Sequence, residues 1–182
     1  MVEERRCLLG LGSNLGNRLA NLQEALRRLE PDVRVVAVSS LYESDPVGPS
    51  GQPAYLNAVA EGMTALEPHP LLRRIKQIEW ELGRRPGPRW GPRPADLDIL
   101  FIDGLTLDAP DLTIPHIGVE ERPFVLVPLA EVAPDLLLNS GRTARRAAAA
   151  ADQSGQRRVA EPMWRDTVSV FPPTIPSDSA RT

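Results

Sequence analysis

Two leucine-rich segments with helical spacing alternate with short β-type segments, and this order restricts the fold more than any other feature. Apolar residues recur at positions 19, 22, 26 and 29, and again at 71, 72, 75, 78 and 82. Pro31 ends the first helical pattern, whereas Pro68 opens the second and Gly83 follows it. Residues 6–12, 33–44, 55–66 and 96–102 are apolar or β-branched runs, which predict strands.

The resulting order is β-α-β-β-α-β, which is that of a split βαβ unit. The sequence therefore predicts an α+β fold: a ferredoxin-like βαββαβ core whose antiparallel sheet carries both helices on one face. The opposite face is expected to be free for a ligand, beside two Pro-rich loops at 45–54 and 84–94.

The C-terminal part is expected to add a helical extension. Residues 141–153, "GRTARRAAAAADQ", are alanine-rich and predict a helix. The composition then turns to Pro, Ser, Thr and Arg. We therefore expect one domain over residues 1–152 and a disordered tail over residues 153–182.

Composition narrows the class of protein. The formal net charge of −3 argues against a general nucleic-acid or membrane binder. Cys7 is the only cysteine, so an internal disulfide and a cysteine-based zinc cluster are excluded, and it is expected in the core. The sequence carries no secretory signal and no apolar run long enough to span a membrane, so the cytoplasm is the expected location.

The segment "DLDIL" places two carboxylates, Asp96 and Asp98, on one face of a predicted strand. Adjacent like charges repel unless a positive group lies between them. The candidates are the arginines just upstream, such as Arg89 and Arg93, or a divalent cation such as Mg²⁺, which carboxylates and phosphates commonly hold together. An exposed strand face with solvated charges is the alternative.

The turn "GSNLGN" follows the first predicted strand. We interpret it as a tight turn that caps the first helix through Ser13, Asn14 or Asn17. It lacks the Lys-Ser/Thr of a phosphate-binding P-loop. A nucleotidyltransferase of the polymerase-β kind would pair such a turn with a nearby DxD, but here the two lie far apart, at positions 13 and 96.

Two further groups of residues are candidates for ligand contacts. His116 and Arg122 could face the carboxylates as phosphate donors, although a cis-proline or a simple turn also explains "IPHI". Tyr55 and Asn57 share a strand face beside the first Pro-rich loop. With Trp90 and Phe124, they could stack on and hydrogen-bond a flat heterocycle, although each ring alone could equally belong to the core.

Several motifs in order resemble one known family. "RWGPRPADLDIL", "GLGSNLGNR", "SSLYESDPVGPSGQPAYLNAV", "IEWELGR" and "LTIPHIGVEERPFVLVPLAEVAPDL" are similar to the landmarks of the 6-hydroxymethyl-7,8-dihydropterin pyrophosphokinases of folate biosynthesis. The resemblance covers about residues 7–138. It implies transfer of pyrophosphate from ATP to the pterin's hydroxymethyl group, with release of AMP, and it implies the ferredoxin-like fold.

The resemblance also assigns roles residue by residue. The family's two Mg²⁺ ions would bind Asp96 and Asp98, which with Arg84 and Arg93 would form the catalytic set. ATP would contact Glu79, Arg93, Ile99, His116 and Arg122. The pterin would contact Ser44, Val47, Tyr55, Asn57, Trp90 and Phe124.

This sequence departs from the family pattern in the loop "RRPGPR" between Gly83 and Trp90, where Arg85 or Arg89 is left to supply a second loop arginine. Lys76, Asp111 and Ile117 are further departures. A non-catalytic pterin- or nucleotide-binding module on the same fold is therefore the alternative function. The expected partners are ATP and the dihydropterin, without nucleic acid or membrane, and the expected state is a monomer.

Overall fold

β1 is an inner strand of the described sheet, next to the middle strand β4. The computed structural model describes residues 3–48, 50–87 and 91–159. β1 pairs antiparallel with β4 on one side and with β5 on the other, and the sheet continues to β3 and β8, while β2 also pairs with β4. The strands are β1 (Arg5–Ser13), β2 (Val33–Val38), β3 (Leu41–Ser44), β4 (Tyr55–Thr64), β5 (Asp96–Ile102) and β8 (Gln156–Val159), with a separate hairpin of β6 (Leu107–Ala109) and β7 (Leu112–Ile114).

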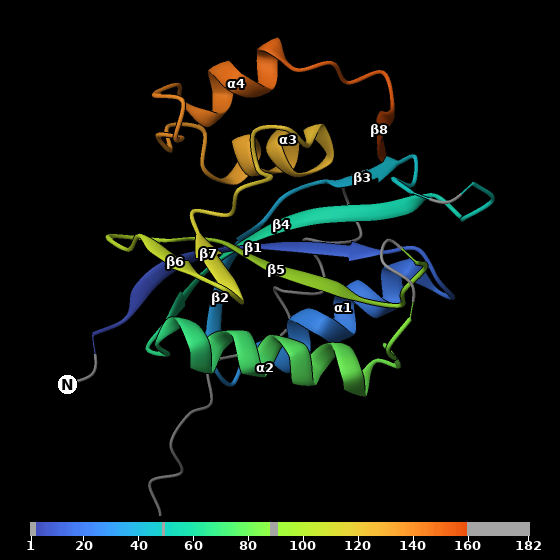
Figure 1. Cartoon of the computed structure of the whole chain (residues 1–182), viewed down its shortest axis with the longest axis horizontal. Coiled ribbons are helices and arrows are strands. Elements are labelled where there is room, and N and C mark those ends of the chain that lie inside the picture. The colour runs from blue at the N-terminus through green and yellow to red at the C-terminus, as the bar shows by residue number, and fades with distance from the viewer. Residues whose placement is uncertain (1–2, 49, 88–90, 160–182) are drawn as a thin grey trace, which may run out of the picture.

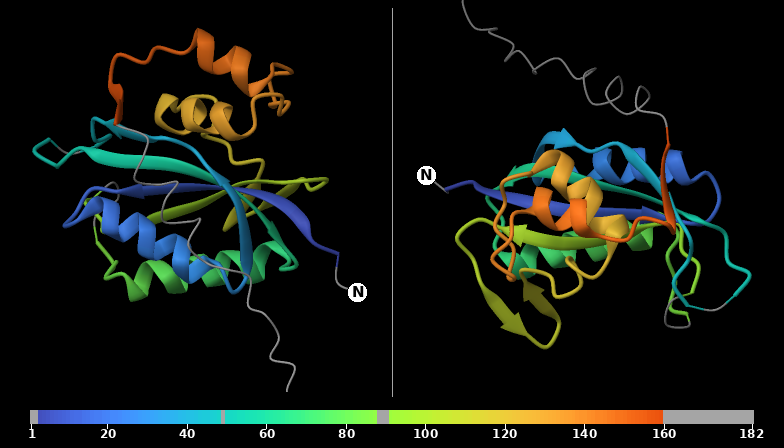
Figure 2. Two further views of the ribbon diagram at one scale, coloured as in Figure 1. Left: turned by 180° about the vertical axis from the view of Figure 1, so that it is seen from behind. Right: turned by 90° about the horizontal axis from the view of Figure 1, so that it is seen from above.

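The helices cover both faces of this sheet. α1 (Arg18–Leu29) and α2 (Pro68–Glu81) lie on one face, and α3 (Pro123–Val132) and α4 (Ala144–Ala150) lie on the other (Figure 1). The left view of Figure 2, seen from behind, shows the same separation. The predicted βαββαβ core is confirmed. The expectation that the second face is free is wrong, because α3 and α4 pack on part of it. None of the described helices is long and apolar enough to cross a membrane.

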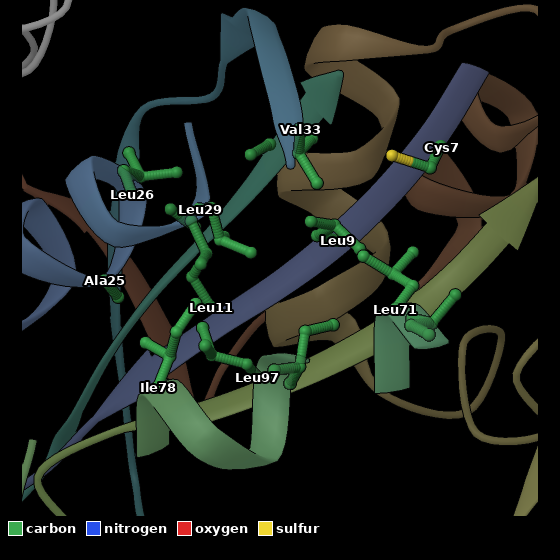
Figure 3. Close-up of a cluster of buried hydrophobic side chains, with 14 of the residues drawn as sticks. Cys7, Leu9, Leu11, Ala25, Leu26, Leu29, Val33, Leu71, Ile78 and Leu97 are labelled. Atoms are coloured by element: carbon green, nitrogen blue, oxygen red, sulfur yellow. The ribbon is translucent and has the colours of Figure 1, made fainter. Parts of the chain in front are cut away.

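The larger apolar core lies between the sheet and the first two helices. Leu9 and Leu11 of β1 point into it, together with Leu29 of α1, Ile78 of α2 and Leu97 of β5 (Figure 3). Each fully buried side chain of this kind contributes about 1.5–3 kcal/mol to stability. Cys7 belongs to the same cluster, as expected, and burial raises the pKa of its thiol to about 12.

The structure divides the strand expected at 33–44 into β2 and β3. Both pair with β4, and the break falls at Ser39. There, the Ser39 hydroxyl accepts a hydrogen bond from the Val59 N–H at 2.9 Å, and the Ser40 N–H donates to the Glu131 carboxylate at 2.6 Å. The Ser39 N–H still donates to the Val59 carbonyl at 2.9 Å, and the side-chain partners complete the bonding where the chain turns from one strand into the next.

The C-terminal part differs from expectation at two places. α3 was not expected as a helix, because "PFVLVPLAEV" is apolar on nearly every side and contains Pro128. β8 lies inside the segment expected as a tail, and it pairs antiparallel with β3. The domain therefore extends past the expected boundary at residue 152, to at least Val159. The rest of the expected tail lies outside the described residues.

Gly62 of β4 is predicted to tolerate no side chain. A Cβ at this position would lie 2.5 Å from Cγ1 of Val33 and 3.2 Å from the Arg34 carbonyl oxygen. Gly62→Ala should therefore lower the free energy of unfolding by about 1–3 kcal/mol, because β2 would have to shift. Urea unfolding followed by circular dichroism measures this change.

Gly87→Ala is the matched control, because the nearest atom to its added Cβ is the Arg85 carbonyl oxygen at 3.9 Å. We expect it to change stability by less than about 0.5 kcal/mol. Equal losses in the two variants would contradict the packing argument.

Candidate active site

Asp96 and Asp98 lie side by side on the sheet face that carries α3 and α4. They begin β5 and pair with Gly12 and Gly10 of β1, while Leu97 between them is buried in the core below. A Cβ on Gly12 would lie only 3.7 Å from the Asp96 Cβ. The two glycines therefore leave open space next to the two carboxylates.

Two arginines from the 84–94 loop neutralise the first of these carboxylates. Arg84 and Arg93 both donate to Oδ1 of Asp96, at 2.7 and 3.1 Å. Among the described residues Asp98 has no hydrogen-bond or ion-pair partner. Arginines are thus present beside the acidic pair, as anticipated, and they leave the Asp98 carboxylate available to a ligand.

Glu79 of α2 ties this charge cluster to the helix layer. Its side chain is only 2% exposed, and its Oε1 accepts from Arg84 at 2.6 Å, from the Leu97 N–H at 2.8 Å and from Lys76 at 3.1 Å. Burial raises the pKa of Glu79, while Lys76, the Leu97 N–H and Arg84 act in the opposite direction. Arg84 therefore lies between two carboxylates, one on α2 and one on β5. Gly83, with φ of 98°, makes the turn that brings Arg84 off the end of the helix.

His116 and Arg122 follow the β6–β7 hairpin and approach the same carboxylates. Burial lowers the pKa of His116, and the Asp98 charge opposes this effect. Nδ1 of His116 accepts from the Gly118 N–H at 3.1 Å, so the neutral ring carries its proton on Nε2. The guanidinium of Arg122 packs against Gly118, where an added Cβ would lie 2.8 Å from its Cζ.

One cavity connects the charged residues with the aromatic ones. Its lining includes the charged residues Arg93, Asp96, Asp98 and Arg122. The same lining contains two aromatic rings, an amide, a hydroxyl and an apolar side chain that the sequence also indicated. These lining residues are Ser44, Val47, Tyr55, Asn57 and Phe124. The structure thus brings together residues from β1, β3, β4, β5 and α3.

Several described candidate residues are not part of this lining. Glu79, Arg84 and Arg85 line a neighbouring cavity that shares Arg93, whereas Ile99 and His116 line neither of the two. Ile99 is 2% exposed and lies in the core on the opposite face of β5, because alternate residues of a strand face opposite sides. Arg85 lies 4.0 Å over the Trp80 ring and donates to the Trp80 carbonyl, so it faces α2 rather than Asp96. Trp90 lies outside the described residues, as does Arg89.

Asn14 is a residue of the site that the sequence indicated only as a helix-cap candidate. Asn17 is the actual cap of α1, accepting from the Ala20 N–H at 3.1 Å. Asn14 is 1% exposed, and its Oδ1 accepts from the Arg93 N–H at 2.7 Å. Its Nδ2 donates to Gln52 and to the Pro53 carbonyl at 3.4 and 3.3 Å. Asn14 therefore joins both Pro-rich loops at their bases.

Asn14→Ala is predicted to loosen both loops together. We expect faster amide hydrogen exchange in peptides covering residues 45–54 and 84–94, with a stability loss of about 1–3 kcal/mol, because buried loop groups lose their partners. Hydrogen–deuterium exchange with mass spectrometry measures this.

Asn17→Ala is the matched control in the same turn. It removes a helix cap at a cost of about 1 kcal/mol, and faster exchange should be confined to the start of α1. If Asn14→Ala leaves either loop protected as in the wild type, Asn14 does not couple the loops.

Comparisons with known proteins agree on one family. Residues 8–134 match the family model described as 7,8-dihydro-6-hydroxymethylpterin-pyrophosphokinase (HPPK). The chain is 46% identical over 157 residues to a 2-amino-4-hydroxy-6-hydroxymethyldihydropteridine pyrophosphokinase of Pseudomonas aeruginosa, covering 85% of this chain and 97% of that one. A protein of the same name from Methylorubrum extorquens is 47% identical over 156 residues, covering 85% and 98%.

The fold is likewise similar to solved HPPK-DHPS structures. An HPPK-DHPS in complex with substrates has a TM-score of 0.66 at 14% identity, covering 86% of this chain and 47% of that one. Wild-type Plasmodium falciparum HPPK-DHPS with pterin and p-hydroxybenzoate also has a TM-score of 0.66, at 17% identity, covering 82% and 43%. This chain spans less than half of either solved chain. The extent of the family match and the identity to full-length relatives show that the chain belongs to the 7,8-dihydro-6-hydroxymethylpterin-pyrophosphokinase family.

Proposed function

We propose that the chain transfers the pyrophosphoryl group of ATP to the hydroxymethyl group of 6-hydroxymethyl-7,8-dihydropterin. The products are the pterin diphosphate, for folate biosynthesis, and AMP. The observation that carries this proposal is the single cavity in which Asp96, Asp98 and Arg93 meet Tyr55 and Asn57. This reaction needs a site that accepts the phosphates of ATP next to a flat heterocycle. The names of the curated relatives support the same reaction.

The heterocycle is proposed to bind in the part of the cavity lined by aromatic and amide side chains. Tyr55 and Phe124 offer ring faces for stacking, and Asn57 offers an amide for the polar edge. Ser44 and Val47 line the same part, where their backbone groups can meet that edge. We assign Trp90 the role of closing the site over the ligand.

Mg²⁺ fits the donor set of Asp96 and Asp98. Both arginines use Oδ1 of Asp96, and Asp98 has no partner among the described residues, so carboxylate oxygens remain for metal. The described residues contain no group of three or more metal-ligating side chains, so phosphate and water would complete the shell. We propose two ions, which would neutralise charge on the triphosphate.

The phosphates are proposed to draw Arg84 and Arg93 away from Asp96. Both guanidiniums are only partly exposed, with side chains 29% and 17% accessible, so they offer preorganised charge to the nucleotide. Glu79 accepts from the same Nη1 of Arg84 that contacts Asp96, so it would keep hold of that nitrogen and fix the direction of the side chain. ATP is proposed to contact Glu79 and the backbone of Ile99 as well.

The reaction forms an O–P bond at the β-phosphorus and breaks the bond between the α- and β-phosphates. The hydroxyl group loses its proton as it attacks, and AMP leaves. The transition state carries negative charge on the phosphoryl oxygens, and the guanidiniums of Arg84 and Arg93 would stabilise that charge. His116 would donate its Nε2–H to a phosphate oxygen, since its lowered pKa favours the neutral ring at pH 7.

The remaining expectations belong to the same proposal. The formal net charge of −3 fits small-molecule partners, ATP and the dihydropterin, better than nucleic acid or an anionic membrane. We propose that the chain works as a monomer in the cytoplasm.

The test is to mix the full chain with ATP, Mg²⁺ and 6-hydroxymethyl-7,8-dihydropterin and to separate the nucleotides by chromatography. One AMP per diphosphorylated pterin is the expected result. Released pyrophosphate would instead indicate a nucleotidyltransferase. Binding of both ligands without AMP would indicate the non-catalytic binding module.

Asp98→Asn is predicted to remove activity without loss of fold. The substitution keeps the shape of the side chain but removes a metal-binding charge, so kcat should fall on the order of 100-fold or more. Because Asp98 has no partner among the described residues, the melting temperature should stay close to that of the wild type. Initial rates and a thermal melt check both parts.

Asp108→Asn is the matched control, since Asp108 is exposed on β6 and lies outside the cavity lining. Its kcat should equal that of the wild type. An Asp98→Asn variant with wild-type turnover would overturn the metal assignment.

A further inference from the structure

The side-chain amide of Asn57 is held in one orientation by two acceptors. Its Nδ2 donates to the Ser44 hydroxyl oxygen at 2.8 Å and approaches the Tyr42 carbonyl oxygen at 3.4 Å. A carbonyl oxygen can only accept, so the nitrogen must face β3 and the oxygen must face the other way. Asn57 is 6% exposed and Ser44 is 5% exposed, so little water competes for these bonds.

The oxygen of Asn57 is turned toward the cavity. Asn57 Oδ1 lies 3.4 Å from the position that a Cβ would take on Gly12, and both residues line the cavity. Because Gly12 has no side chain, this oxygen is left uncovered on the side of β1. The amide therefore presents an acceptor to a ligand, while both of its donor hydrogens are directed at β3.

Ser44 is enclosed by strands on both sides. β4 places Tyr55 opposite it and Asn57 within reach of its hydroxyl, and β8 places Gln156 opposite it. Both polar atoms of the Gln156 side chain are buried without a hydrogen-bond partner among the described residues, so they do not compete for the Ser44 hydroxyl. Without that hydroxyl, only the longer contact with the Tyr42 carbonyl would hold the amide.

We propose that Ser44 is a positioning residue that fixes the Asn57 oxygen toward the cavity, so that the site selects a heterocycle through an N–H donor. This inference rests on the proposed function and specifies how the substrate is recognised. If a ligand placed a ring nitrogen without hydrogen against Asn57 Oδ1, two hydrogen-bond acceptors would face each other and repel.

The proposed substrate suits such a site. A 7,8-dihydropterin carries N–H donors at N3, at N8 and on its 2-amino group. Its fully oxidised counterpart lacks the N8 hydrogen, an N3-methyl derivative lacks the N3 hydrogen, and a 2-desamino derivative lacks the amino group. Each analogue therefore removes one donor and leaves the others, which allows the donor that meets Asn57 to be identified.

The test is calorimetric binding of the four pterins to the full chain, in the presence of Mg²⁺ and α,β-methylene ATP. In the wild type, the analogue that lacks the hydrogen facing Asn57 should bind about 5- to 10-fold more weakly than the dihydropterin, because it loses one buried hydrogen bond. Ser44→Ala should weaken the dihydropterin by a similar factor. The penalty for that one analogue should then shrink to less than about 2-fold, because the two changes remove the same interaction.

Two further variants separate positioning from general damage. Ser44→Thr keeps the hydroxyl and should restore the wild-type penalty. Ser40→Ala removes a hydroxyl that accepts from Arg158 at 2.7 Å and lies outside the cavity lining, so all four affinities should stay as in the wild type. Melting temperatures show that each variant is folded.

Two outcomes overturn the inference. Equal analogue penalties in the wild type and in Ser44→Ala would show that Ser44 does not orient the amide. Equal binding of all four pterins by the wild type would show that no N–H is read. Neither outcome bears on whether the wild type forms AMP. The proposed function is contradicted only if the wild type forms no AMP.

Discussion

The alternation of side chains along β1 is the constraint on which the rest of the structure depends. Leu9 and Leu11 enter the core with α1 and α2, whereas Gly10 and Gly12 lie on the other face, beside Asp98 and Asp96. β1 is paired on both edges, so its register is set by two neighbours at once. A slip of one residue would place leucines in the cavity and glycines in the core. The same strand therefore secures stability and keeps the site open.

The charges of the site depend on this geometry as well. Asp96 is accompanied by Arg84 and Arg93, and Arg84 is shared with the buried Glu79. The buried Glu79 carboxylate would be costly without a positive partner. Arg84 supplies that partner and also pairs with Asp96, so these ion pairs hold α2, the 84–94 loop and β5 together. Asn14 adds neutral hydrogen bonds to the same loop. The loop is thus held at its base before any ligand is present.

Most of the core could be predicted because its elements carry their own periodic signals. α1 and α2 have apolar residues at helical spacing with Pro or Gly at their ends, and these signals are local. The break between β2 and β3 depends instead on the Ser39 hydroxyl meeting Val59, a contact across twenty positions of sequence. α3 has no polar face, so its periodicity is weak. β8 is joined to β3 partly by the Arg157–Glu43 ion pair, which no local pattern reveals.

The candidate site, like the fold, was predicted from the sequence only in part. The sequence indicated which residue types gather in it, and the cavity lining contains most of them. The family resemblance assigned Ile99 to ATP, whereas strand alternation turns its side chain into the core, so only its backbone can face the site. Asn14 looked like one of several caps for a helix, because its partners, Gln52 and Arg93, come from two separate loops.

The sequence by itself determined the helices α1 and α2, the strand faces and the chemistry of the acidic pair, because these follow from the spacing of neighbouring residues. Only the tertiary structure decided which arginines meet Asp96, which asparagine joins the loops and which way the Asn57 amide points. Each of these depends on the distance between atoms that are remote in the chain. Such distances exist only once the sheet register has brought the strands together.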